Sequence, residues 1–115
     1  MNHADFQAVR SRLTTIKAQF DDLINELQKD SPDRLWVKTK YGALKVKLRH
    51  DADSFKTKKG QTQASDSESA FYYPAVTEAC LELTVKIDAP PNEKMLHCLM
   101  SGEEQIAYYL SRMNT

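Results

Sequence analysis

The residue types that most often hold metals or act as nucleophiles are few in this chain, and their spacing suits neither task. His97 and Cys98 are adjacent, so on a helix their side chains would point in different directions. Glu93 and His97 stand one helical turn apart, but two ligands do not make a metal site. The other candidates are scattered along the sequence: His3, His50 and Cys80. We expect no metal and no cofactor.

Catalytic motifs are equally scarce. Cys80 and Cys98 lie in apolar neighbourhoods, where a thiol stays protonated and unreactive. The chain has three glycines, too few and too far apart for a phosphate-binding loop. Adjacent carboxylates such as Asp21-Asp22 are typical of a solvent-exposed helix surface rather than of a catalytic pair. The sequence therefore predicts no catalytic residues and a protein that is not an enzyme.

Positive charge is concentrated in the middle of the chain. The 16 basic and 16 acidic residues cancel overall, but residues 34–59 contain nine basic residues against Asp51 and Asp53. A local field of this kind can steer an anionic partner. Trp36 adds an aromatic ring that could stack on a base or anchor a partner. The predicted binding residues are Trp36, Lys38, Lys40, Lys45, Lys47, Arg49, Lys56, Lys58 and Lys59.

Residues 34–50 show the alternation of a β-hairpin. Apolar and basic side chains alternate on both sides of Tyr41-Gly42, where glycine suits a tight turn. In this pairing Lys38 lies opposite Lys45, and like charges placed so are destabilising. Such a basic face persists if water screens it, if an acidic side chain such as Glu82 covers it, or if an anion binds there. A lysine-guarded edge that resists aggregation is the alternative without a ligand.

Residues 3–29 predict one long helix with Asn2 as its N-cap, ending before Pro32. Its apolar residues recur at spacings of three and four. The helix could lie across its own sheet, or it could pair with a second chain in a homodimer. The residues of that dimer seam would be Phe6, Val9, Leu13, Ile16 and Phe20.

The rest of the chain predicts a loop, further strand and two helices. Residues 51–69 read as a flexible loop, and the alternation at 81–87 follows a second strand-like run at 71–73. A first helix is expected over 92–100. The Ser101-x-x-Glu104 pattern then predicts a second helix from Gly102.

Together these elements predict a single α+β domain over residues 1–115: a long N-terminal helix, an antiparallel sheet of three or four strands containing the basic hairpin, and a C-terminal helical pair on one face. The 41% apolar fraction is that of a globular protein. No segment reaches the ~18 apolar residues of a membrane span. Two cysteines and a start without a signal sequence favour the cytoplasm.

Two functions remain open for such a domain. The first is binding of nucleic acid through its backbone, because cations and an aromatic ring share one face. The second is a protein–protein role, in which an inhibitor, immunity protein or chaperone-type adaptor docks an acidic partner protein. Both are non-enzymatic, and neither involves a membrane.

Overall fold

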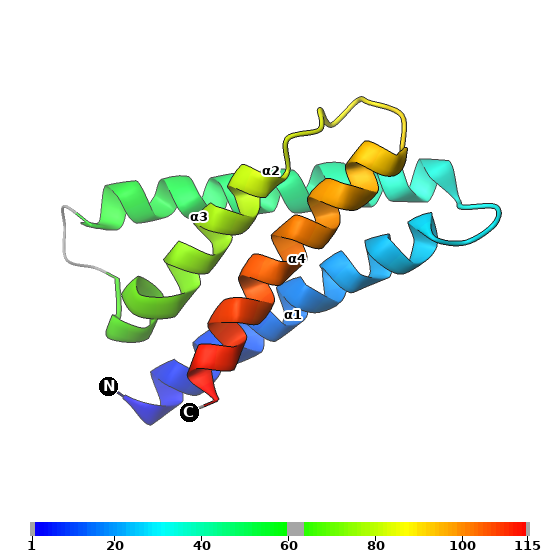
Figure 1. Ribbon diagram of the computed structural model, residues 1–115. Helices are drawn as coiled ribbons and strands as arrows, with labels where there is room; N and C mark the ends of the chain where they lie inside the picture. The colour runs from blue at the N-terminus through cyan, green and yellow to red at the C-terminus, as the bar shows by residue number, and fades with distance from the viewer. Residues whose placement is uncertain (1, 60–63, 115) are drawn as a thin grey trace.

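The computed structural model describes residues 2–59 and 64–114. In chain order these residues form α1 (His3–Leu27), α2 (Arg34–Lys59), the π-helix η1 (Glu68–Tyr72), α3 (Tyr73–Glu82) and α4 (Glu93–Met113) (Figure 1). No β-strand occurs within them, so the predicted α+β fold with its antiparallel sheet is wrong. This part of the chain folds as an all-helical bundle.

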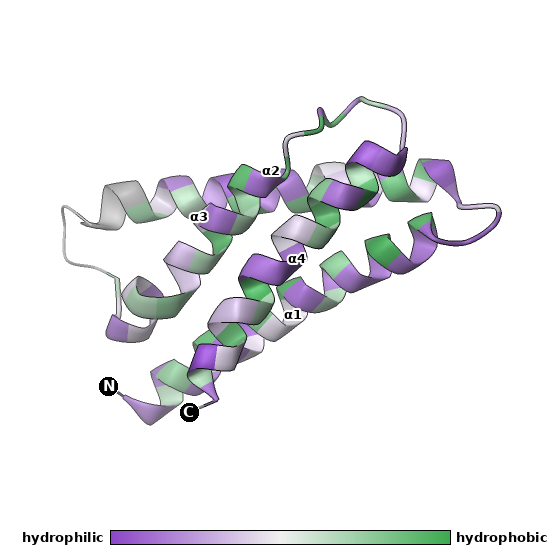
Figure 2. Cartoon of the chain, viewed as in Figure 1, coloured by the Kyte–Doolittle hydropathy of each residue, from purple (hydrophilic) through white to green (hydrophobic). Residues whose placement is uncertain are grey.

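The α-helices pack in the spatial order α1, α4, α3, α2 (Figure 1). α4 lies between α1 and α3, and α3 packs on α2. α1 and α2 are consecutive in sequence but contact each other much less. Hydrophilic and hydrophobic bands alternate along the helices (Figure 2), as expected when each helix buries part of its surface. α2 therefore rests mainly on α3, and much of its circumference stays open.

The predicted N-terminal helix is present as α1. Asn2 Oδ1 accepts the backbone N–H of Asp5 at 3.1 Å, which confirms the N-cap. At the other end, Glu26 accepts the backbone N–H of Asp33 at 2.9 Å and closes the turn towards α2. Asp33 Oδ1 in turn accepts the N–H of Trp36 at 3.0 Å. These hydrogen bonds fix where α2 begins.

The predicted hairpin at 34–50 is instead the first part of α2. Val37, Tyr41, Leu44 and Leu48 recur at spacings of four, three and four, and all are buried on one side of the helix. Further along, the Phe55 ring stacks on Tyr73 with centroids 4.6 Å apart. A helix places these four side chains on one buried side, whereas a hairpin would separate Tyr41, in its turn, from the other three.

The predicted loop at 51–69 is also largely helical. α2 continues to Lys59, and η1 begins at Glu68; residues 60–63 lie outside the described chain. Ser65 and Glu68 form a capping box, because Ser65 Oγ accepts the Glu68 N–H and Glu68 Oε1 accepts the Ser65 N–H, both at 3.1 Å. Asp5 reaches across from α1 and accepts from Ser65 Oγ at 2.8 Å and from the Ser67 N–H at 3.2 Å. The start of this helix is thus tied to the start of α1.

The strands predicted around 71–73 and 81–87 are also wrong. Residues 68–82 form a continuous helical segment whose first turn is widened. The N–H of Tyr73 bonds to the carbonyl of Glu68, five residues back. Pro74 follows directly; it has no N–H, and its ring would clash with the carbonyl four residues earlier in a regular helix. The widened turn accommodates the proline.

α4 is one helix, so the predicted break at Ser101-Gly102 is wrong. Asn92 Oδ1 caps it by accepting the Met95 N–H at 3.1 Å. Gly102 is needed for packing rather than for a turn, because a Cβ there would lie 2.7 Å from Cε1 of Phe20. Phe20 is fully buried. This contact lets α1 and α4 approach closely.

Gly102→Ala is expected to lower the free energy of unfolding by about 1–2 kcal/mol, because overpacking against Phe20 outweighs the gain in helix propensity. Urea denaturation would measure this, with Ser101→Ala as the control beside it. The loss should shrink in a Phe20→Leu background. An increase in stability on Gly102→Ala would show that the contact is not tight.

Acid should weaken the hydrogen bonds that join Asp5 of α1 to Ser65 and Ser67 at the start of η1. Hydrogen bonds from Ser65 and Ser67 hold the pKa of the Asp5 carboxyl below its usual value of 3.8. Because the folded-state pKa is the lower one, this stabilisation is complete above pH 3.8 and is lost as the pH falls through the folded value. Asp5→Asn should reduce the loss of stability on acidification, measured by thermal melts at several pH values. Asp66→Asn, at an exposed position, is the control and should leave the profile unchanged.

Candidate functional site

α2 carries apolar residues on two sides, and the bundle buries only one of them. The outer side exposes Leu35 (76%) and Val46 (57%). Thr39 and Ala43 lie between them on the same side at helical spacing and are exposed, while Gly42 shares this side but is buried beneath Ile87. We call these five residues the outer stripe. Its two large side chains belong to the set that produced the strand-like alternation in the sequence.

The connection between α3 and α4 forms one wall beside the outer stripe. Ile87 packs on Gly42, where a Cβ would lie only 2.9 Å from Ile87 Cγ2. With Asp88 it borders a shallow groove that follows the stripe from Leu35 to His50. The groove has mainly apolar walls and opens to solvent.

Two hydrogen bonds from α2 hold this wall in place. The carbonyl of Val85 accepts the hydroxyl of Tyr41 at 2.5 Å and the ammonium of Lys45 at 2.8 Å. Burial raises the pKa of Tyr41, so its hydroxyl stays protonated and donates. Lys45 is only 8% exposed. It is therefore a structural residue, and its partner is Val85 rather than the suggested Glu82.

The other predicted lysines line the two flanks of the outer stripe. Helical geometry places Lys38 and Arg49 on one flank and Lys40 and Lys47 on the other. All four are exposed. Lys47 forms an ion pair with Asp51 at 3.4 Å, but no ion pair joins the other three to a described residue. The side chains of Lys56, Lys58 and Lys59 lie outside the described part of the chain.

Trp36 lies on the flank of Lys40 and Lys47, but not on an open face. It is half-buried against the core. Together with Asp22 and Leu23 of α1, it lines a narrower groove between α1 and α2. The single basic, aromatic surface expected of a hairpin is therefore split, and Trp36 is separated from Lys38 and Arg49.

The residues predicted for a dimer seam lie inside the chain's own core. Val9, Leu13, Ile16 and Phe20 are almost completely buried there. Phe6 is half-buried in an edge-to-face contact with Phe71, with ring centroids 5.9 Å apart. This placement favours the alternative in which the N-terminal helix packs within its own chain.

A second polar network joins three helices at the opposite end of α2 from the turn. The guanidinium of Arg12 lies 3.7 Å from the centre of the Tyr72 ring and forms an ion pair with Glu68 at 3.2 Å. Tyr72 donates its hydroxyl to Asp51 at 2.5 Å. Burial, followed by this carboxylate, raises the pKa of Tyr72. The network is internally satisfied and anchors the helices rather than offering groups to a substrate.

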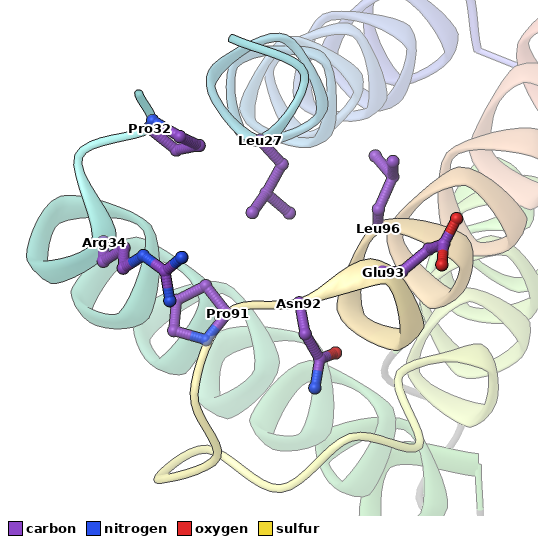
Figure 3. Close-up of a pocket in the computed structure, with 7 residues that line it drawn as sticks. All are labelled: Leu27, Pro32, Arg34, Pro91, Asn92, Glu93 and Leu96. Carbon is purple, nitrogen blue, oxygen red and sulfur yellow. The ribbon is translucent and has the colours of Figure 1, made fainter. Parts of the chain in front are cut away.

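The lining of the pocket between the α1–α2 turn and the start of α4 has two charged side chains, Arg34 and Glu93, and contains no cysteine, histidine or serine (Figure 3). Leu27 and Leu96 face its interior, and Arg34 lies at its edge beside Pro91. Asn92 is already used to cap α4.

Metal-binding and membrane-spanning features are missing from residues 2–59 and 64–114. No three His, Cys, Asp or Glu side chains among them converge on a point where a metal ion could bind. No helix in these ranges combines the length and apolar character required to cross a bilayer. Cys80 and Cys98 are free thiols, and Cys98 donates to the carbonyl of Met95.

Several residues that shape the candidate site and the helices around it were not predicted from the sequence. The S-x-x-E pattern at 65–68 was a signal for the capping box, while the same pattern at 101–104 lies within α4. Val37, Tyr41, Leu44 and Leu48 had the spacing of a helix face. Nothing in the sequence indicated that Ile87 would pack on Gly42. Comparison of the chain with protein-family models, curated protein sequences and solved structures gives no match.

Lys45 and Lys38 should respond differently to charge reversal. Lys45→Glu removes the hydrogen bond to Val85 and places a carboxylate beside that carbonyl. We expect the free energy of unfolding to fall by about 1.5–3 kcal/mol. Lys38→Glu, at an exposed position, should change it by less than about 0.5 kcal/mol. Urea denaturation of both variants measures this difference, and equal effects would contradict the assigned role of Lys45.

Proposed function

We propose that this protein is a non-enzymatic binding module that holds an acidic segment of a partner protein on the outer stripe of α2. The observation that carries the proposal is the exposure of Leu35 and Val46 in one line between basic flanks. An apolar patch rimmed by polar side chains is typical of an interaction surface.

Burial of the outer stripe would be favourable. Covering a leucine or valine side chain contributes roughly 1.5–3 kcal/mol each relative to full exposure. Leu35 is 76% exposed and Val46 57% exposed, so more than half of this free energy is still available from each when a partner covers it. Leu81 on α3 is similarly exposed, at 73%, but it does not line the groove. The line of apolar side chains, rather than exposure alone, distinguishes the outer stripe.

The flanks determine the sign of the partner's charge. Lys38 and Arg49 on one side and Lys40 and Lys47 on the other would attract carboxylates and speed their association. A second copy of α2 on this face would bring basic flanks together. The charge arrangement therefore supports an acidic partner protein rather than self-association through the outer stripe.

Nucleic acid fits this surface less well. The outer stripe separates the cations into two groups. A phosphate backbone lying between them would offer no apolar contact to Leu35 and Val46. The Trp36 ring, which was expected to stack on bases, is half-buried in the groove beside α1. Interfacial membrane binding also suits the surface poorly, because such helices bury a broad face of bulky side chains, while Thr39, Gly42 and Ala43 are small.

The test compares two labelled probes by fluorescence anisotropy at ~50 and ~200 mM salt. One is a designed acidic peptide with leucines at helical spacing, and the other is a single-stranded oligonucleotide. We expect the peptide to bind and the Leu35→Gln/Val46→Gln variant to lose at least tenfold in affinity. Leu81→Gln is the matched control and should bind normally.

Two outcomes would refute the proposal. In the first, the peptide fails to bind at the lower salt. In the second, the oligonucleotide binds more tightly than the peptide and the Leu35→Gln/Val46→Gln variant binds it as the original chain does.

A further inference from the structure

We infer that the partner segment docks as an α-helix lying lengthwise along α2, so that α2 becomes a central helix covered on two sides. This inference rests on the proposed function and specifies the partner's conformation. Three observations support it: the absence of a strand edge, the shape of the groove and the distribution of charge.

The first observation concerns backbone hydrogen bonds. A peptide that binds in an extended conformation commonly adds a strand to a sheet edge, where its N–H and C=O groups find partners. No sheet exists in residues 2–59 and 64–114. The backbone groups of α2 beneath the groove are engaged within the helix. A segment buried on this surface must therefore satisfy its own backbone groups, which a helix does.

The second observation is the shape of the groove. Its floor is made by the small residues Thr39 and Ala43, with Leu35 and Val46 along it and Ile87 at its side. The lining runs along one side of α2 from Leu35 to His50, which at ~1.5 Å per residue is roughly 22 Å, or about four helical turns. Small floor residues permit an interaxial distance of about 8–10 Å, as in ordinary helix packing.

The third observation is the presence of basic side chains on both flanks. Lys38 and Lys47 line the groove on opposite sides of the outer stripe, and Arg49 and Lys40 lie farther out on the same two flanks. The groove also holds two carboxylates: Asp88, and Asp51, which is engaged by Lys47 and Tyr72. The matching helix has an apolar row at spacings of three and four, with Glu or Asp on each side of that row. Such a helix supplies apolar contacts and charge complementarity together. An acidic chain without that apolar row would pair with the basic flanks but would leave Leu35 and Val46 uncovered.

The experiment uses the full chain and two designed acidic peptides of about 18 residues. They have the same charge and the same leucines, but one carries a central proline in place of alanine. Proline in a helix interior is strongly unfavourable, so the proline peptide should bind at least tenfold more weakly by isothermal titration calorimetry. Circular dichroism should show more helix in the mixture of protein and alanine peptide than in the sum of the two separately.

A variant of the groove floor tests the site itself. Ala43→Leu keeps the surface apolar and remains compatible with a helix, yet it fills the floor on which the partner would lie. We expect it to weaken binding of the alanine peptide at least tenfold. Ala18→Leu, at an exposed position on α1, is the matched control. Thermal melts of both variants would show whether the fold is retained.

The outcomes separate this inference from the proposed function. If both peptides bind equally and both are lost on Leu35→Gln/Val46→Gln, the acidic-partner function stands and the helical docking is wrong. Unchanged circular dichroism on binding would also overturn the helical docking. If neither peptide binds, the proposed function and the inference fail together.

Discussion

The close packing of α1 on α4 depends on the contact between the Phe20 ring and Gly102, where a Cβ would lie only 2.7 Å from Cε1 of the ring. Any larger residue in α4 at this point would push α1 away. With α1 and α4 in contact, α3 occupies the other side of α4 and brings its small residues Ala75 and Ala79 into the core. α2 is then reached chiefly by α3 and by the connection that follows it. Because α1 pairs with α4 and contacts α2 only sparsely, α2 keeps a side that none of the described helices covers.

The open side of α2 also explains why its sequence has the alternation typical of a strand. In a helix with one buried face, the apolar residues follow a period near 3.6. Here Val37, Leu44 and Leu48 point inward while Leu35 and Val46 point outward. Two apolar rows on one helix superpose in the sequence as an alternating pattern, which is the period of a strand. Residue composition was the better guide, since this segment is rich in lysine and leucine, both good helix formers.

Other parts of the fold could be predicted from the sequence, because helices that bury only one face show a clear helical period. α1 and its Asn2 cap were predicted from periodicity and capping chemistry, and both are present. Near the end of the chain, Ile106 and Met113 stand two helical turns apart in the sequence, and both are core residues. The widened turn before Pro74 and the packing of Ile87 on Gly42 depend on contacts between distant segments, which local patterns do not encode.

The sequence was enough to predict which basic residues of the candidate site are exposed, but not how they are arranged on the surface. Lys38, Lys40, Lys47 and Arg49 are surface residues in either fold, since their charge keeps them in water. Their division into two flanks, and the use of Lys45 to hold Val85, follow from helical geometry and from the path of the connection after α3. A hairpin would have placed the same lysines on one continuous face.

The pairing of α1 with α4 has a consequence for the order of folding. α1 packs chiefly on α4, which lies far along the chain, and its contacts with the neighbouring α2 are sparse. Until α4 is in place, the apolar row around Leu13 and Phe20 has no complete cover. Contacts between distant segments cost loop-closure entropy before they stabilise the chain, so we expect the core to close late in folding. In a partly folded chain both this row and the outer stripe of α2 face the solvent, and such a chain is most vulnerable to aggregation.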